Sequence, residues 1–399
     1  MGCSLSSAGG ATSPEPAPNV PAAVTQHGNG AAAGPVTGMV VDCGSGHASV
    51  LWYATVDTGV KQLRRSRLQV AASKTQFKLA DELAAASAAD LDERINRACW
   101  LLQSEMEAAE AEGLPLPSYL FIGATGGVRE VLSSGAVQRE AFDQFAAAVQ
   151  KHFGHLERVR VLCLSGEQEA IWELKAARHI WGPIAEAMFG VEPQPDSSFG
   201  LFSGGGQSMQ IAGIDASGGS LSWPFSTWCE AMDESRGVSP EAWKQPETWG
   251  EWEAQLGGLI ATEKGRLGDA VPLSGCCVLT AMNEVAAKAA GFGEQPITAD
   301  AATAACRHAL AQFRAGTGEA FEEFLAKRKH YKYNVARVTA MHLCRLALVL
   351  EELCAPQMLL YAPDPRKHSD LHCEWALGAF ITDASGRRLS ASTVDAFRG

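Results

Sequence analysis

Asp42 closes an apolar run, and Gly44, Ser45 and Gly46 follow it before His47. Glycines leave neighbouring backbone N–H groups unhindered, so a turn of this kind can hold an anion. A carboxylate beside the turn is placed to hold a metal ion. The turn lacks the GxGxxG pattern of dinucleotide sites and the lysine of a P-loop, and an ordinary hairpin turn is the alternative interpretation.

A second glycine turn echoes the first far along the chain. Phe202 and Ser203 precede three consecutive glycines, Gly204 to Gly206, and Ser208 and Gln210 follow them. Two such turns that face each other across a cleft can hold one polyphosphate from both sides.

Thr125, Gly126 and Gly127 follow a buried apolar run and open a helical segment that contains Arg129. The N-terminus of a helix binds anions through its unsatisfied N–H groups, and an arginine there can bind a phosphate with two hydrogen bonds. The simpler alternatives are a surface arginine and a threonine that only caps the helix.

Glu169 lies in the first turn of another expected helix, just after a strand. Ser165 and Gln168 form a capping box that starts this helix. Because active sites of α/β proteins form where strands end, a carboxylate at this position can polarise a water molecule. The alternative is an acid that only compensates the helix dipole.

The composition excludes several classes of protein. The chain has 399 residues, enough for two domains, and its net charge of −12 argues against nucleic acid as the main partner. No segment has the roughly 20 apolar residues that a membrane-spanning helix needs, and the N-terminus lacks the apolar core of a secretory signal. The 11 cysteines have no paired spacing, so we expect reduced thiols in a cytoplasmic protein.

The N-terminus fits a lipidation motif. Gly2 follows the initiator methionine with Ser6 behind it, which is the pattern for myristoylation, and Cys3 is a candidate for palmitate. Two acyl chains would give peripheral association with the cytoplasmic face of a membrane. Residues 1–35 are rich in Ala, Gly, Pro and Ser, so we expect a flexible tether.

Strands and helices alternate along the rest of the chain, which predicts an α/β fold with a mainly parallel sheet. We expect strands at 39–41, 48–53, 119–122, 158–164, 199–202 and 358–361. We expect helical segments within 79–106, from the Thr125 turn through 150, and at 167–180, 272–290 and 334–353, with a closing segment at 375–381.

Five motifs in this order resemble the conserved regions of the nucleoside triphosphate diphosphohydrolase, or apyrase, family. They begin at Asp42, Gly123, Ser165, Gly205 and Trp375, the last being Trp-Ala-Leu-Gly. Exopolyphosphatases share the same scaffold and similar early motifs. The resemblance covers residues 40–381 and implies a two-domain actin-like ATPase (ribonuclease H-like) fold, with domain I at 36–163 plus 375–399, domain II at 164–374 and a cleft between them.

The resemblance also implies roles for residues. Asp42 would hold Mg²⁺ or Ca²⁺ through waters, and Glu169 would be the general base. Ser208 and Gln210 would position the attacking water. The terminal phosphates of a nucleoside tri- or diphosphate would be bound by Ser45, Gly46, His47, Thr125, Gly126, Arg129, Gly205 and Gly206.

One expected acid of this family is missing. If Ser208 and Gln210 are aligned with the fourth motif, Ser203 stands where an aspartate is expected, and if the glycines are aligned instead, Phe202 does. Three hypotheses therefore stay open: a nucleotide hydrolase, an exopolyphosphatase, and a nucleotide-binding protein or membrane-tethered scaffold without activity.

Overall fold

The computed structural model divides the chain into two units, Met1–Gly34 and Pro35–Gly399. It describes residues 36–44, 46–57, 59–70, 75–190, 199–205, 208–213, 218–222, 246–267, 275–293, 295–327, 333–364, 367 and 369–385. All of these belong to the second unit. The predicted tether at 1–35, with Gly2 and Cys3, lies outside the described residues.

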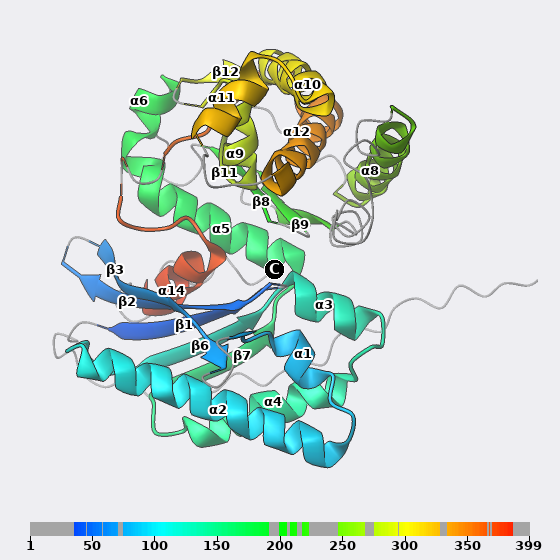
Figure 1. Cartoon of the computed structure of the whole chain (residues 1–399). Helices are drawn as coiled ribbons and strands as arrows, with labels where there is room; N and C mark the ends of the chain where they lie inside the picture. Colours follow the sequence, from blue (N-terminus) through cyan, green and yellow to red (C-terminus); the bar gives the residue numbers. More distant parts are fainter. Residues whose placement is uncertain are drawn as a thin grey trace, which may run out of the picture. The chain divides into compact units, whose positions relative to one another are not determined.

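The first sheet has five strands in the order β3-β2-β1-β6-β7. β1, β2 and β3 are antiparallel neighbours, whereas β6 and β7 run parallel to β1 (Figure 1). The strands are β1 (Thr37–Cys43), β2 (Ala48–Val56), β3 (Gly59–Arg67), β6 (Tyr119–Ala124) and β7 (Arg158–Cys163). Because β1, β6 and β7 are parallel, the turns that follow them lie along one edge of the sheet.

The second sheet repeats this arrangement in the order β10-β9-β8-β11-β13-β12. β8, β9 and β10 are antiparallel neighbours, β11 and β13 run parallel to β8, and β12 is an added antiparallel edge strand. The strands are β8 (Gly200–Gly204), β9 (Ser208–Ala212), β10 (Gly218–Ser222), β11 (Cys276–Ala281), β12 (Ile297–Thr298) and β13 (Leu359–Tyr361). A small pair, β4 (Gln69–Val70) and β5 (Thr75–Gln76), stands apart from both sheets.

Helices cover both sheets. The first sheet has α1 (Leu79–Leu83), α2 (Ala88–Ala111), α3 (Gly126–Ser133) and α4 (Arg139–His152) around it. The chain continues with α5 (Gly166–Trp181), the short η1 (Gly182–Ile184) and α6 (Ala185–Phe189). The later helices are α8 (Pro246–Leu267), α9 (Met282–Ala289), α10 (Ala299–Ala315), α11 (Glu319–Lys327), α12 (Tyr333–Leu353) and α14 (Trp375–Ser385). In the part of the chain that the structure describes, none of these helices is long and apolar enough to cross a membrane.

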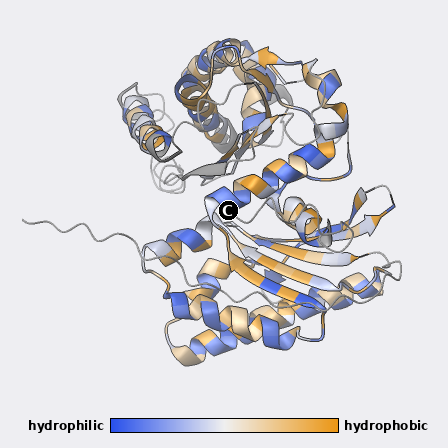
Figure 2. Ribbon diagram, turned by 180° about the vertical axis from the view of Figure 1, so that it is seen from behind, coloured by the Kyte–Doolittle hydropathy of each residue, from blue (hydrophilic) through white to orange (hydrophobic). Residues whose placement is uncertain are grey.

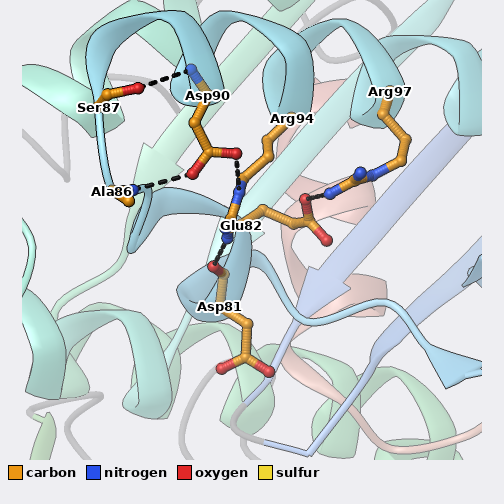
Figure 3. Close-up of polar contacts among 7 residues, drawn as sticks. All are labelled: Asp81, Glu82, Ala86, Ser87, Asp90, Arg94 and Arg97. Carbon is orange, nitrogen blue, oxygen red and sulfur yellow. Dashed lines mark hydrogen bonds and ion pairs between the residues drawn. The ribbon is translucent and has the colours of Figure 1, made fainter.

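Helix α2 shows how local sequence fixes an element. The Ser87 hydroxyl accepts a hydrogen bond from the Asp90 N–H at 3.2 Å, and the Asp90 carboxylate accepts one from the Ala86 N–H at 2.9 Å (Figure 3). Arg94 then joins Asp90 to the carbonyl of Asp81, which ties α2 to α1. These bonds satisfy N–H groups that a helix start otherwise leaves free.

Three hydrophobic cores hold the described part together. One lies between the first sheet and α2 with α4, and another between the second sheet and α9, α10 and α12. The third core contains residues of both sheets together with α5 and α14, for example Phe121, Leu174, Leu201 and Leu377. Figure 2 shows apolar stretches along the strands of the first sheet, and helices that alternate between apolar and polar positions.

Three sequence expectations need correction. Both sheets are mixed rather than mainly parallel, because each contains antiparallel hairpins beside its parallel strands. The segment 272–290, expected to be a helix, contains β11 followed by α9, because Ala281 has a φ of 54° and interrupts any continuous helix. The helix expected to run through 150 is two helices, α3 and α4, because Gly135 has a φ of 72° between them. Both breaks use a left-handed conformation that a helix interior does not permit.

Candidate functional site

The two glycine turns occupy the same place in their sheets. The N–H of Gly44 donates to the carbonyl of His47 at 3.1 Å in the first turn, and the N–H of Gly205 donates to that of Ser208 at 2.8 Å in the second. Each turn joins two antiparallel strands, β1 to β2 and β8 to β9.

The strand register shows which residue corresponds to Asp42. Asp42 lies opposite Ser49 across the first hairpin, and Ser203 lies opposite Gln210 across the second. The pair next to the turn is Cys43 with Ala48 in the first hairpin and Gly204 with Met209 in the second. Asp42 and Ser203 each belong to the following pair, so Ser203 is the equivalent of Asp42. Within this chain the register therefore pairs Asp42 with Ser203 and not with Phe202; how the second turn aligns with the fourth apyrase motif stays a prediction.

Asp42 lies among other acids. Burial, together with the nearby carboxylates of Glu374 and Glu169, raises the pKa of its carboxyl from 3.8 to about 8, while Trp375 and Arg65 oppose the rise. Its Oδ1 is buried and has no hydrogen-bond partner among the described residues. A cation beside Asp42 would relieve both the burial cost and the repulsion.

Glu169 and Arg129 form an ion pair of 2.8 Å. Arg129 reaches Glu169 from α3 and also donates to the carbonyl of Leu164 at 2.8 Å, so it fixes the start of α5 against the end of β7. Burial raises the pKa of Glu169, and Arg129 opposes that rise. The Nη2 atom of Arg129 is buried without a partner in the described part of the chain.

Thr125 lies at the N-cap of α3, next to the first turn. Its side chain does not cap the helix; its hydroxyl instead donates to the carbonyl of Cys43 at 3.4 Å, and its N–H donates to the same carbonyl at 3.1 Å. The simple capping role is thus wrong. Thr125 joins the ends of β1 and β6, with Gly126 as the first residue of α3.

Ser208 and Gln210 lie side by side on β9. The amide of Gln210 donates to the hydroxyl of Ser208 at 2.9 Å, and both residues are buried. Since the Ser208 hydroxyl accepts this bond, its own hydrogen is free to be donated elsewhere.

A buried arginine that the sequence analysis missed supports the second turn. Arg345 on α12 donates to the carbonyl of Gly205 at 3.1 Å and to the side chain of Asn283 at 2.8 Å. Burial lowers the pKa of Arg345 to about 9. A Cβ atom at Gly204 would overlap the guanidinium, so only glycine leaves room for it. Nothing in the sequence links these distant positions.

Two further acids were also missed. Glu173 lies one helical turn after Glu169 and is buried, and Glu374 directly precedes Trp375. Arg65 forms an ion pair of 2.6 Å with Glu374. Glu173 could have been found from its i, i+4 spacing to Glu169, which places both side chains on one face of α5.

The remaining predicted phosphate contacts are placed only in part. Gly46 is exposed and His47 partly exposed, whereas Ser45 and Gly206 lie outside the described residues. The N–H of Gly205 is already used within its own turn.

The acids fit a hydrated cation better than a dehydrated one. Among the described residues, no group of three or more His, Cys, Asp or Glu side chains is placed to coordinate an ion directly. Asp42, Glu173 and Glu374 each have a buried carboxylate oxygen without a partner in that part of the chain. Such oxygens suit Mg²⁺, which keeps several waters and uses few carboxylates.

Comparison with solved structures identifies the fold. A Ppx/GppA family member from Aquifex aeolicus matches with a TM-score of 0.54 and 13% identity over 90% of this chain and 100% of its own. The type II variant of the Aquifex aeolicus Ppx/GppA phosphatase matches with a TM-score of 0.52 and 13% identity, over 87% of this chain and 99% of its own. The chain has the actin-like ATPase fold. This confirms the fold expected from the five motifs.

Other comparisons do not narrow the family. Nucleoside triphosphate hydrolases from Neospora caninum match with a TM-score of 0.48 and 10% identity over 88% of this chain and 94% of their own, which is too weak to carry an argument. No protein-family model matches the sequence, and no curated protein does. Membership of the apyrase family therefore stays a hypothesis.

Proposed function

We propose that this protein hydrolyses the terminal phosphate of a substrate with linked phosphates, with the help of a divalent cation and with Glu169 as general base. The observation that carries the proposal is the proximity of Asp42 and Glu169, whose charges act on each other although they belong to β1 and α5. A metal-binding acid close to a buried base is what phosphoryl transfer to water requires.

Asp42 would hold Mg²⁺ or Ca²⁺ through bound waters. The cation would neutralise charge on the phosphate oxygens. Its site is supported by the buried Oδ1 of Asp42, which has no hydrogen-bond partner among the described residues.

The chain's own residues would position and activate the water. Gln210 fixes the Ser208 hydroxyl, which can then donate to the water or to a phosphate oxygen. Glu169 takes a proton from the water while the water oxygen bonds to the terminal phosphorus. The bond between that phosphorus and the bridging oxygen then breaks. Arg129 holds Glu169 in place through their ion pair and opposes the rise that burial causes in its pKa.

Two substrate classes fit this chemistry. The order of the five motifs favours nucleoside tri- or diphosphates, as in apyrases. Inorganic polyphosphate is the second class, because exopolyphosphatases share the early motifs of this chain; the fold comparison with a Ppx/GppA phosphatase is compatible with both classes. We place nucleotides first because the glycine turns and the Trp-Ala-Leu-Gly motif follow the apyrase order throughout.

A phosphate-release screen tests the proposal. Purified protein with Mg²⁺ or Ca²⁺ would be given ATP, ADP and polyphosphate chains. Glu169→Gln should lower the rate about a thousandfold, because a positioned base contributes roughly 10² to 10⁴. Glu167→Gln is the matched control, since Glu167 is exposed on the same first turn of α5.

The result also separates the remaining hypotheses. Release from polyphosphate but not from nucleotides would favour the exopolyphosphatase. Tight ATP binding in calorimetry with no release from any substrate would favour a pseudoenzyme and sink the hydrolase.

We also propose that Gly2 and Cys3 carry acyl chains that tether the protein to the cytoplasmic face of a membrane. The motif Met-Gly-Cys-Ser-Leu-Ser supports this proposal. Mass spectrometry of the N-terminus in cells tests it, and Gly2→Ala should release the protein from membranes.

A further inference from the structure

The second glycine turn lacks the acid that the first one has, and the structure places another carboxylate beside the vacant position. Ser203 is the register equivalent of Asp42. Its hydroxyl hydrogen-bonds the carboxylate of Glu173, which belongs to α5. Glu173 therefore meets the end of β8 from the helix side.

Glu173 is a buried acid with an unsatisfied oxygen, which distinguishes it from an ordinary surface acid. Only 8% of the residue is exposed, and Oε2 is buried without a hydrogen-bond partner in the described part of the chain. A buried carboxylate oxygen without a partner is costly, so such atoms need an explanation in a ligand, an ion or a water.

The surroundings of Glu173 point toward the candidate site. Burial, together with the nearby acids Glu169, Asp42 and Glu374, raises the pKa of Glu173 well above its ordinary value, so its carboxyl group lies near these acids. No arginine or lysine forms an ion pair with Glu173 among the described residues. A cation beside Glu173 would favour its ionised form against burial and the neighbouring acids.

We propose that Glu173 takes the place of the aspartate missing at Ser203 and helps to hold the hydrated divalent cation. This inference rests on the proposed phosphohydrolase site. The carboxylate has moved from the strand to the facing helix, and the serine hydroxyl orients it.

This exchange can be reversed by substitution. Glu173→Gln removes the charge but keeps the size of the side chain and an acceptor for Ser203. Ser203→Asp places a carboxylate back on the strand, where it crowds the existing Glu173. The double variant Ser203→Asp/Glu173→Gln carries one carboxylate at position 203 on β8 and none at position 173 on α5.

The experiment measures Mn²⁺ binding by the full-length protein with electron paramagnetic resonance, and phosphate release in parallel. Glu173→Gln should weaken Mn²⁺ binding at least about tenfold, as loss of an outer-shell partner does. The double variant should return to within about threefold of the wild-type protein. Glu167→Gln, on the exposed side of α5, should bind Mn²⁺ as the wild-type protein does.

Several results would overturn the inference. These are wild-type Mn²⁺ binding in Glu173→Gln, a double variant that folds but binds as weakly as Glu173→Gln, or no binding by the wild-type protein. If Glu173→Gln is too unstable to assay, Mn²⁺ binding by the double variant alone tests the inference. If the Mn²⁺ pattern holds but no protein releases phosphate, the inference stands and the proposed hydrolase falls.

Discussion

At the scale of single residues, the site concentrates negative charge that the described residues balance only in part. Arg129 offsets Glu169 and Arg65 offsets Glu374, but Asp42 has an unpartnered oxygen. Burial raises the pKa of Asp42 to about 8. An acid whose pKa is higher in the folded than in the unfolded chain favours folding at low pH and loses that contribution as the pH rises.

Asp42→Asn should therefore change how stability depends on pH. Between pH 4 and pH 8, the melting temperature of the metal-free protein should fall with rising pH, and Asp42→Asn should flatten this fall. A difference of about 1 kcal/mol would appear as roughly 2 to 4 °C. Thermal melts in EDTA measure it.

The control for this experiment is Asp143→Asn. Asp143 is exposed and pairs only with Arg139 on its own helix. It should follow the wild-type curve at every pH. If Asp42→Asn also follows that curve, Asp42 does not titrate as the structure indicates.

The sequence indicated where the glycine turns and helix starts lie, while the functional roles of the residues in them stay predictions. Asp42 and Glu169 are acids at strand ends, and the structure brings them together. Arg345 could not be predicted, because its role depends on α12 passing beneath the second turn. The contact between Ser203 and Glu173 could not be predicted either, because it depends on the strand register and on how α5 packs in the tertiary structure.

At the scale of elements, α14 and α5 pack very closely behind the first sheet. A Cβ atom at Gly378 would overlap the backbone of Trp172, and one at Gly123 would overlap the ring of Trp375. Trp172 and Trp375 stack with ring centroids 6.1 Å apart. The Trp-Ala-Leu-Gly motif thus has a packing role that also positions Glu374 beside Asp42.

Gly378→Ala should push α14 away from α5. Overpacking of a tight contact costs about 1 to 3 kcal/mol, so urea unfolding should show a loss of this size. Gly182→Ala is the control, because a Cβ atom there meets nothing within 4 Å. Equal stability of the two variants would contradict the close packing.

Ala281 offers a second prediction at this scale. It has a φ of 54° at the end of β11, where it pairs with Gly204. Ala281→Gly should raise the free energy of unfolding by about 1 kcal/mol, because glycine adopts positive φ without strain. Ala286→Gly, inside α9, should lower it by about the same amount. A loss of stability in both variants would argue against strain at Ala281.

This strained position also explains an error in the sequence-based prediction. Residues 272–290 are apolar enough for a buried helix, and periodicity alone does not separate a short buried strand from a helix. The six strands that the sequence predicted correspond to β1, β2, β6, β7, β8 and β13, whereas β3, β9, β10 and β12 were not predicted.

At the scale of the whole molecule, one core joins the two sheets. Phe121 of the first sheet and Leu201 of the second belong to the same buried cluster, with α5 and α14. A shared core couples the stability of the elements that build it. The part of the chain from 36 to 385 should therefore unfold as one cooperative unit.

Unfolding followed by far-ultraviolet circular dichroism and by tryptophan fluorescence should give coincident transitions. Leu377→Ala, in the shared core, should shift both by the same amount and lower the stability by about 2 to 5 kcal/mol. Leu116→Ala is the control, because Leu116 is 57% exposed. Two separate transitions would show that the halves are independent.

The contact between Ser203 and Glu173 also predicts how these two positions vary among homologous proteins. The two sheets repeat one plan, which is the mark of an ancestral unit that was duplicated. The second sheet has Ser203 where the first has Asp42, and Glu173 of α5 lies beside this serine. Homologous sequences should accordingly show the two positions changing together: an aspartate at the first should accompany an uncharged residue at the second.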